Sequence, residues 1–236
     1  MHNVYQNAYL LHKLRTGHKE RDKGRQQLRA DLSGRMFTFP QQTNSAQVRL
    51  VLSGLDLSAL TVCLRYFTDL GRDYSLFSLA TPSADNALLI YKEAASDRIN
   101  LAIRNSGAVF RGQDYRLNTW HSVCATWDSA SGVGQMWLDG KPSSRKFISS
   151  GSDISGPIII VLGQEQDSHG GGFDINQSFV GMLSDIHMWD HTLLPCQIQN
   201  YEDYLTFTAG NLLNWRTLEF LTKGRVLIED KHEPYC

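Results

Sequence analysis

The amino-acid sequence predicts an all-β fold in which two antiparallel sheets pack face to face, with one short helix near residues 195–205. Apolar and β-branched runs of about four to eight residues recur along most of the chain, and clusters of turn residues separate them. A helical period is almost absent, which favours a two-sheet sandwich. The expected strands are residues 37–40, 47–52, 60–67, 74–80, 87–91, 99–103, 120–127, 133–138, 145–148, 158–162, 179–183 and 186–189.

Two local signals add detail to this fold. Asp139-Gly140 follows an apolar run, and because both residues tolerate positive φ we expect a hairpin turn there. Pro195 suits the first position of a helix. The apolar residues that follow it would then form a stripe facing a sheet, made of Ile198, Tyr201 and Leu205.

The chain of 236 residues divides into two regions by charge. Residues 1–35 carry eight Lys/Arg and three Asp/Glu, whereas the whole chain carries 23 and 24. We therefore expect a basic N-terminal arm, partly helical or flexible, followed by one mildly acidic β domain at residues 36–236. The spacing that supports a short helix in the arm is that of Val4, Ala8, Leu11 and Leu14.

Charge and hydropathy exclude several kinds of protein. A mildly acidic domain lacks the basic face that binds phosphates, so no nucleic acid is expected as a primary partner. No run approaches the roughly 20 apolar residues of a membrane span. The first residues also lack the apolar core of a signal peptide, which leaves two interpretations open: a secreted protein whose signal has been removed, or a protein that is not secreted.

The four cysteines leave several pairings open. Cys63 and Cys124 lie within expected strands, whereas Cys196 and Cys236 lie towards the C-terminal end. Four cysteines allow three pairings, and the sequence does not choose among them. Because no Cys-x-x-Cys spacing occurs, a metal site built from cysteines is not expected. Paired cysteines would suit an oxidising, extracellular setting.

A glycine-rich acidic segment, residues 163–177, lies between two expected strands and is the main candidate for a binding site. It contains Glu165, Asp167 and Asp174 together with several amides. A hard cation such as calcium takes six to eight oxygen ligands and tolerates the irregular geometry of a loop. The alternative is a solvated surface loop that binds nothing.

Several longer stretches resemble the pentraxin family. They are HSVCATWDSASGVGQMWLDGKP, VLGQEQDSHGGGFDINQSFVGMLSDIHMWD and GNLLNWRTLEF, and LTVCLRYFTDL and YSLFSLATPSADNALLIYKE extend the match to about residues 36–230. The resemblance implies a secreted, lectin-like jelly-roll sandwich. It also implies assembly into a cyclic homo-oligomer, usually a pentamer, and calcium-dependent ligand binding.

The resemblance assigns site residues as well. It implies a disulfide between Cys63 and Cys124; Cys196 and Cys236 would then either bridge each other or link to another chain. It implies two calcium ions per protomer, and the matching ligands are Asp85, Asn86, Glu165, the main-chain carbonyl of Gln166, Asp167, Asp174 and Gln177. Ligand contacts are expected from Tyr91 and Ala102.

Several positions depart from the family pattern. Asp174 stands where relatives of this kind generally carry glutamate; because aspartate is one methylene shorter, we expect the second calcium to bind more weakly unless the loop moves inward. Ser122 stands in the place of a signature histidine, with His121 one position earlier, and we expect a changed core contact with no effect on the site. Gly107 stands near the position from which a glutamate of some relatives contacts a choline cation. Because a quaternary ammonium without a carboxylate or an aromatic cage loses most of its directed attraction, phosphocholine is not the expected ligand.

The leading functional hypothesis is calcium-dependent pattern recognition in innate immunity, as in acute-phase proteins. The expected ligands are phosphate- or carboxylate-bearing small molecules and polysaccharides on microbes or cell debris, with complement components as candidate partners. The alternative is an extracellular module of a long pentraxin or adhesion receptor that serves adhesion or assembly. An enzyme is not expected: Glu165-Gln166-Asp167 begins the Glu-x-Asp-x-x-Glu motif of jelly-roll glycosidases, but Gly170 stands where the acid is needed.

Overall fold

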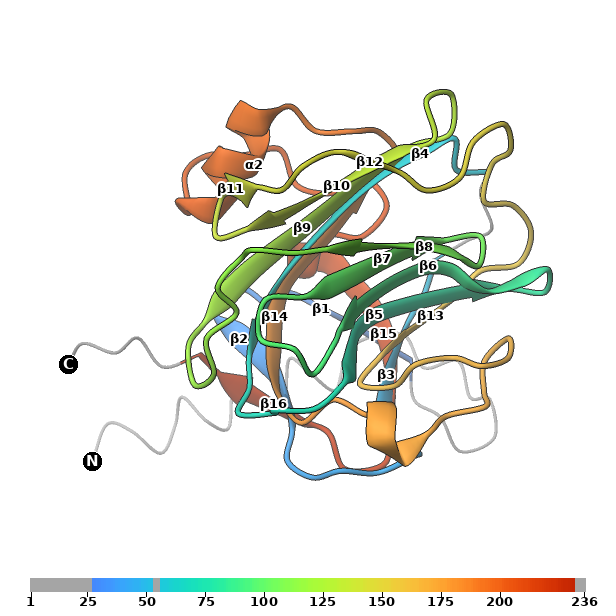
Figure 1. Ribbon diagram of the computed structural model, residues 1–236. Coiled ribbons are helices and arrows are strands. Elements are labelled where there is room, and N and C mark those ends of the chain that lie inside the picture. Colours follow the sequence, from blue (N-terminus) through green and yellow to red (C-terminus); the bar gives the residue numbers. More distant parts are fainter. Residues whose placement is uncertain (1–26, 53–55, 232–236) are drawn as a thin grey trace, which may run out of the picture.

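A computed structural model describes residues 27–52 and 56–231 of the chain (Figure 1). The strands are β1 (Gln27–Ala30), β2 (Arg35–Phe39), β3 (Gln47–Leu50), β4 (Ala59–Phe67), β5 (Tyr74–Thr81), β6 (Ala84–Lys92), β7 (Ile99–Ile103), β8 (Ser106–Phe110), β9 (His121–Asp128), β10 (Val133–Leu138), β11 (Lys141–Pro142), β12 (Lys146–Phe147), β13 (Ile159–Leu162), β14 (Gly181–Trp189), β15 (Leu218–Lys223) and β16 (Leu227–Asp230). The helical segments are η1 (Ile175–Gln177), α2 (Pro195–Glu202) and η2 (Trp215–Thr217). Within this described part, no helix has the length and apolar character needed to cross a membrane.

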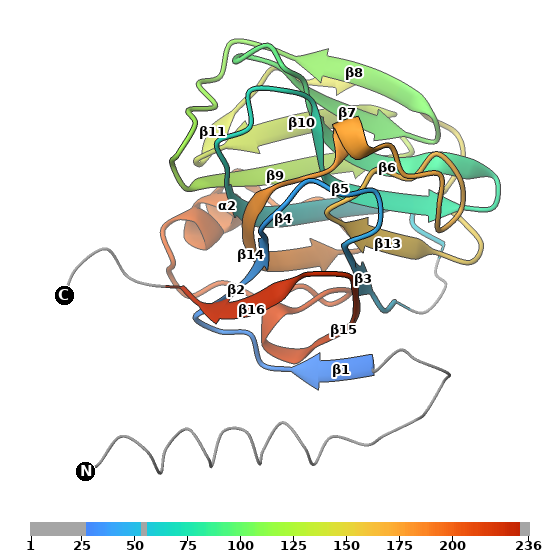
Figure 2. The ribbon, with the colours of Figure 1, turned by 90° about the horizontal axis from the view of Figure 1, so that it is seen from below.

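The strands form two antiparallel sheets. The first sheet has the order β1-β15-β3-β13-β5-β6-β7-β8, and the second has the order β11-β10-β9-β4-β14-β2-β16, with β12 paired to β10. Figures 1 and 2 give perpendicular views of these two layers, which enclose the core. The predicted all-β jelly-roll sandwich with one short helix is confirmed.

The core lies between the sheets because alternate residues of each strand point inward. Leu88 and Ile90 of β6, Leu64 of β4 and Trp127 of β9 are all 0% exposed and belong to one apolar cluster. Full burial of one such side chain contributes on the order of 1.5–3 kcal/mol relative to leaving it in water. The apolar runs that predicted the strands therefore also supply the side chains that fill the space between the sheets.

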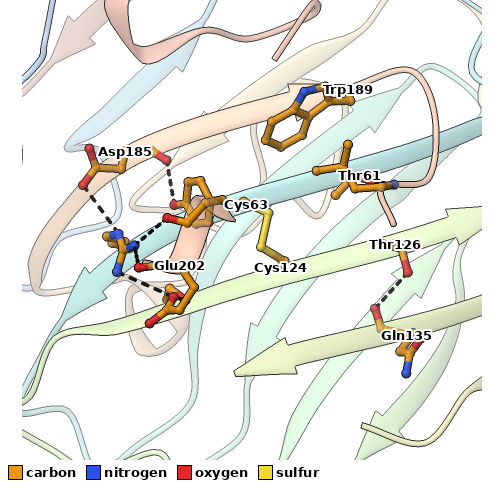
Figure 3. The surroundings of a disulfide bond; sticks show 12 residues. Thr61, Cys63, Cys124, Thr126, Gln135, Asp185, Trp189 and Glu202 are labelled. Atoms are coloured by element: carbon orange, nitrogen blue, oxygen red, sulfur yellow. Dashed lines mark hydrogen bonds and ion pairs between the residues drawn. A yellow bond between two sulfur atoms is a disulfide. The ribbon is translucent and has the colours of Figure 1, made fainter. Parts of the chain in front are cut away.

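The outer face of the second sheet is covered by α2 over a disulfide. Cys63 of β4 and Cys124 of β9 are direct ladder partners and form the disulfide that the family resemblance implied, with an S–S distance of 2.01 Å (Figure 3). A second apolar cluster surrounds it and joins it to the helix; its members are Cys63, Cys124, Trp137, Trp189, Ile198 and Tyr201. The disulfide thus links the two strands beneath the helix.

The helix differs from its prediction at one end. Pro195 is the first helical residue as expected, and Ile198 and Tyr201 are buried. The prediction that Leu205 continues this stripe is wrong: α2 ends at Glu202 and the side chain of Leu205 is 56% exposed. The backbone carbonyls of Tyr201 and Glu202 accept hydrogen bonds from Nη2 of Arg65 at 2.9 and 2.7 Å, which is consistent with an end at this point.

The ends of the chain extend the sheet region beyond the expected boundary. Gln27–Ala30 forms β1, which pairs with β15, and Leu32 is 3% exposed, so sheet structure begins before residue 36. The expected arm helix at Val4 to Leu14 and the cysteine at Cys236 lie outside the described residues.

Two expected runs near the end of the sandwich form a single strand. Residues 179–183 and 186–189 were expected as separate strands, and β14 contains most of both. The register against β4 shifts between Ser184 and His187, and Asp185 has a φ of 54°. A β-bulge at the polar pair therefore breaks the alternation of the sequence without ending the strand. The Asp139-Gly140 turn is confirmed, with φ values of 49° and 72°.

Candidate functional site

The loop between β13 and β14, residues 163–177, is fixed at its start by glycine and by a buried glutamine. Gly163 has a φ of 90°, and a Cβ there would overlap the ring of Phe39. The side chain of Gln166 is fully buried: its Nε2 donates to the Ser78 carbonyl at 2.9 Å, and its Oε1 accepts from the Gly170 amide at 3.0 Å. Because this side chain holds the loop to β5, it leaves the main-chain carbonyl, the group that the family resemblance implies as a ligand, as the one that Gln166 could offer to a metal.

Four of the predicted metal ligands come together where this loop meets the start of β6. Glu165 is 3% exposed, and its pKa is raised to about 7, first by burial, then by the charge of Asp167 and a hydrogen bond shared with it. The charge of Asp85 adds to the rise, and a hydrogen bond with the Asn86 side chain opposes it. A buried carboxylate among like charges is unstable alone and is stabilised by a cation.

Two buried oxygens at this place, Asn86 Oδ1 and Glu165 Oε2, accept no hydrogen bond from any described residue, and neither does Oε1 of Gln177 in the second half of the loop. Buried acceptors are normally paired, so each needs an explanation. Carboxylate and amide oxygens are the ligands that calcium prefers, and this donor set fits such an ion. Across the described ranges, no three His, Cys, Asp or Glu side chains group closely enough to hold a metal by themselves, so the fit depends on the amide oxygens.

The second half of the loop holds Asp174 and Gln177 less closely to this cluster. Asp174 is exposed and caps η1: its Oδ1 accepts from the Asn176 backbone amide at 2.9 Å and from the Asn176 side chain at 3.1 Å. Gln177 instead contacts Tyr91 through a side-chain hydrogen bond that lowers the pKa of the tyrosine. The structure thus links Gln177 to the ligand-binding side of the site, whereas no contact joins Asp174 to Glu165.

Two residues between β4 and β5, Arg72 and Asp73, connect the second half of the loop with Tyr91 of β6. Nη1 of Arg72 donates to the carbonyls of Asn176 at 2.8 Å and of Asp73 at 2.7 Å. Oδ2 of Asp73 accepts from the Tyr91 hydroxyl at 3.3 Å. Burial first, and then the charge of Asp73 and this hydrogen bond, raise the pKa of Tyr91 well above its usual value. Sequence reasoning missed this Arg72–Asp73 clasp because the pair carries no local motif.

The outer face of β6, β7 and β8 carries the predicted ligand contacts. Tyr91 pairs with Asn100, and Leu89 pairs with Ala102, which in turn pairs with Gly107. Residues two apart in a strand share a face, so Tyr91 and Ala102 lie on one surface, with Ala102 8% exposed. Asn100 on the same surface was not predicted, because only the register shows that it faces Tyr91.

The hairpin between β7 and β8 holds the backbone of Asn86 through two hydrogen bonds with Asn105. Arg104 and Asn105 have φ values of 51° and 65° at its tip. Oδ1 of Asn105 accepts from the Asn86 amide at 2.9 Å, and the Asn105 amide donates to the Asn86 carbonyl at 3.0 Å. Asparagine tolerates this left-handed backbone, which is the one signal in the sequence that could have indicated the turn.

The departure at Ser122 lies on the other side of the molecule. Oγ of Ser122 donates to Glu202 of α2, and the Ser122 amide donates to Asp139 at 2.9 Å. Nδ1 of the neighbouring His121 lies 2.8 Å from Asp139. Burial alone would lower the pKa of His121, but its hydrogen bond with Asp139 and the charge of that residue together raise it. These contacts involve the second sheet and α2, and none involves residues 163–177.

Known proteins share both the sequence and this fold. The profile of the Pentaxin family matches residues 35–230. The serum amyloid P-component of Cavia porcellus is 39% identical over 85% of this chain and 89% of the relative, and the C-reactive protein of Sus scrofa is 37% identical over 86% and 90%. A native heptameric SAP-like pentraxin from Limulus polyphemus superimposes with a TM-score of 0.78 and 26% identity, over 86% of this chain and 98% of that one. The chain therefore belongs to the pentraxin family, whose members are binding proteins rather than enzymes.

Proposed function

We propose that this pentraxin is a calcium-dependent recognition protein that binds phosphate- or carboxylate-bearing ligands. The observation that carries the proposal is that two buried oxygens among the carboxylates of Asp85 and Asp167, Asn86 Oδ1 and Glu165 Oε2, have no hydrogen-bond donor, as is also true of Gln177 Oε1 in the same loop. A hard cation pairs all of these groups at once. It also removes the repulsion that raises the pKa of Glu165 to about 7.

Two ions per protomer are proposed. The first would take Asp85, Asn86, Glu165, the carbonyl of Gln166 and Asp167. The second would share Glu165 and Asp167 and add Asp174 and Gln177. Because Oδ1 of Asp174 caps η1, its other oxygen is the one offered to the second ion.

Bound calcium would supply the positive charge to which an anionic group of the ligand attaches. The chain's own residues then select what lies beside that group. Tyr91 is half-buried on the outer face, with Ala102 and Leu89 as small or apolar neighbours. Gly107 pairs with Ala102 and supplies no carboxylate, which argues against a choline cation as the group bound there. Phosphorylated or carboxylated small molecules and polysaccharides on microbes or cell debris fit this surface.

The proposed setting is extracellular, in innate immunity. The relatives named serum amyloid P-component and C-reactive protein support an acute-phase-type role with complement components as candidate partners. The disulfide between Cys63 and Cys124 is stable in an oxidising compartment and supports secretion. The heptameric Limulus relative supports a ring of identical subunits, for which we propose a pentamer.

Calorimetric titration of the whole protein tests the function. We expect phosphoethanolamine or a phosphorylated sugar to bind in millimolar calcium and to show no heat of binding in excess chelator. Ligand binding that survives chelation contradicts the proposal. Light scattering in the same two buffers gives the number of subunits and its dependence on calcium.

An adhesion or assembly module remains the second proposal. Cys196, at the second position of α2, is exposed and forms no disulfide with a described residue, so it is available for a link to Cys236 or to another chain. Mass spectrometry of peptides under non-reducing conditions identifies its partner. A bond to a different chain favours assembly, and a Cys196–Cys236 bond within the chain contradicts it.

A further inference from the structure

Two further unpaired buried oxygens lie in one cross-strand row of the first sheet and are not explained by the proposed calcium ligands. They are Oγ of Ser75 and Oδ1 of Asn100, which accept no hydrogen bond from the described residues. Ser75 is completely buried, whereas Asn100 is half-buried and is therefore the one within reach of a ligand. Asn100 stands directly opposite Tyr91 in the ladder between β6 and β7. Side chains opposite each other in an antiparallel ladder have Cβ atoms about 5 Å apart, so this carboxamide adjoins the predicted ligand contact.

The neighbours of Asn100 do not supply the missing donor. The hydroxyl of Tyr91 is directed to Asp73, at 3.3 Å from its Oδ2. On the other side Asn100 pairs with Val109, and next to that stands Gly107; neither side chain carries a polar hydrogen. An unsatisfied carboxamide that is shielded from water lowers the stability of the fold. The arrangement is therefore maintained at a cost to stability.

The shape of the surface around Asn100 depends on a glycine. A Cβ at Gly107 would lie 2.9 Å from Oδ1 of Asn100, so the carboxamide occupies the space above that glycine. The terminal torsion of asparagine has broad, roughly two-fold minima, so the amide plane turns without a change in the backbone of β7. Because either end of the amide is then presented to an incoming group, the residue offers one acceptor and one donor side by side.

We propose that Asn100 determines specificity by binding a hydroxyl of an anionic sugar or polyol whose phosphate or carboxylate is held at the proposed calcium site. This inference rests on the proposed function. A hydroxyl both donates and accepts hydrogen bonds, which matches a carboxamide. An ammonium group bound here would lose its hydrating water without gaining a carboxylate from these rows to pair with its charge. The two cross-strand rows of this surface contain no acidic residue; they are Ser75, Tyr91, Asn100 and Val109, and Ser78, Leu89, Ala102 and Gly107.

The test compares two ligands that carry the same anion. Glycerol 3-phosphate has hydroxyls beside its phosphate, and propyl phosphate has none. In saturating calcium we expect the protein to bind glycerol 3-phosphate about 2- to 10-fold more tightly, the effect of one net hydrogen bond. In Asn100→Ala the preference should disappear, through loss of affinity for glycerol 3-phosphate alone. Ser106→Ala, at an exposed position of β8, is the matched control and should keep the preference.

The outcomes separate this inference from the function on which it rests. If neither phosphate binds in calcium, the proposed function fails. If both bind with equal affinity to the unmodified protein, the function stands and the role of Asn100 is overturned. If Asn100→Ala weakens both ligands by the same factor, Asn100 serves only the structure of β7, and the inference is also overturned.

Discussion

The two outer faces of the sandwich are covered in different ways. On the second sheet, α2 and its apolar cluster lie over the disulfide, and the buried Arg65 meets opposite charges at Asp185 and Glu202, 3.9 and 3.7 Å away. On the first sheet, the carboxylate of Glu165 meets the like charges of Asp167 and Asp85. One face is stabilised by the chain itself, and the other carries the proposed calcium site. Stability experiments in the presence and absence of calcium distinguish the two.

The largest expected effect is on the helix-covered face. Replacing both Cys63 and Cys124 by alanine opens a loop with a sequence separation of 61, and should lower the free energy of unfolding by about 4 kcal/mol. The loss should be the same in calcium and in chelator, because the disulfide contacts no proposed calcium ligand. Urea unfolding followed by tryptophan fluorescence measures it. A loss confined to one of the two buffers would contradict the division between the faces.

Acidification should also act on the helix-covered face, through His187. This side chain packs against Trp189 and Tyr201, and burial lowers its pKa to about 4, opposed by the charge of Asp185 and aided by that of Arg216. Between pH 6.5 and 4 the His187 side chain therefore binds a proton in the unfolded chain but not in the folded one, so the contribution of His187 to stability is greatest above pH 6.5 and falls as the pH drops to 4. The loss attributable to His187 should be on the order of 3 kcal/mol.

The control for this prediction is His187→Gln, which removes the titrating group but keeps a polar side chain near the Gly210 amide. Its free energy of unfolding should depend less on pH between 6.5 and 4 than that of the unmodified protein. Equal pH dependence of the two proteins would show that His187 does not contribute.

On the ligand face, Glu165→Gln should have opposite effects on two quantities. Calcium at 100 times its dissociation constant should stabilise the unmodified protein by about 2.7 kcal/mol, and most of this gain should be lost in the variant. In chelator at pH 8, the variant should be more stable than the unmodified protein, because it removes a buried charge from among like charges. Thermal unfolding in both buffers measures each quantity.

Glu202→Gln is the matched control on the other face. It removes a carboxylate that lies 3.7 Å from Arg65, so it should lower stability equally in both buffers and leave the calcium gain unchanged. If Glu165→Gln is less stable than the unmodified protein in chelator, Glu165 is a structural carboxylate and the comparison between the faces fails.

The smallest expected effect comes from the Arg72–Asp73 clasp. Arg72→Ala removes the hydrogen bond to the Asn176 carbonyl and so frees the turn that carries Gln177. We expect calcium affinity to fall about 3- to 10-fold, and Arg72→Lys, which keeps one donor, to recover part of it. Arg98→Ala, which removes an exposed arginine beside Glu93 and Asp97, should leave calcium affinity unchanged. Unchanged affinity in Arg72→Ala would show that the loop is positioned without the clasp.

The sequence predicted what depends on local pattern and missed what depends on register. Short apolar and β-branched runs between turn residues located most strands, and Pro195 located the start of α2. Leu205 continued the helical spacing, but the chain leaves the helix before reaching it. Asp73 and Asn100 have no signal of their own, because each matters only through Tyr91, which lies on another strand or beyond a loop. Residues whose roles depend on a partner across a ladder cannot be identified from spacing along the chain.

The buried carboxamide of Gln166 has a practical consequence. Its hydrogen bonds to Ser78, Ile159 and Gly170 fix the beginning of the loop through protein groups alone. If calcium binds as proposed, chelation should therefore act on the far part of the loop and leave its beginning attached to β5. A column that carries this protein should release captured ligand when it is washed with chelator, and should regain its capacity when calcium is returned. We therefore expect ligand binding to recover on addition of calcium without any refolding of the protein.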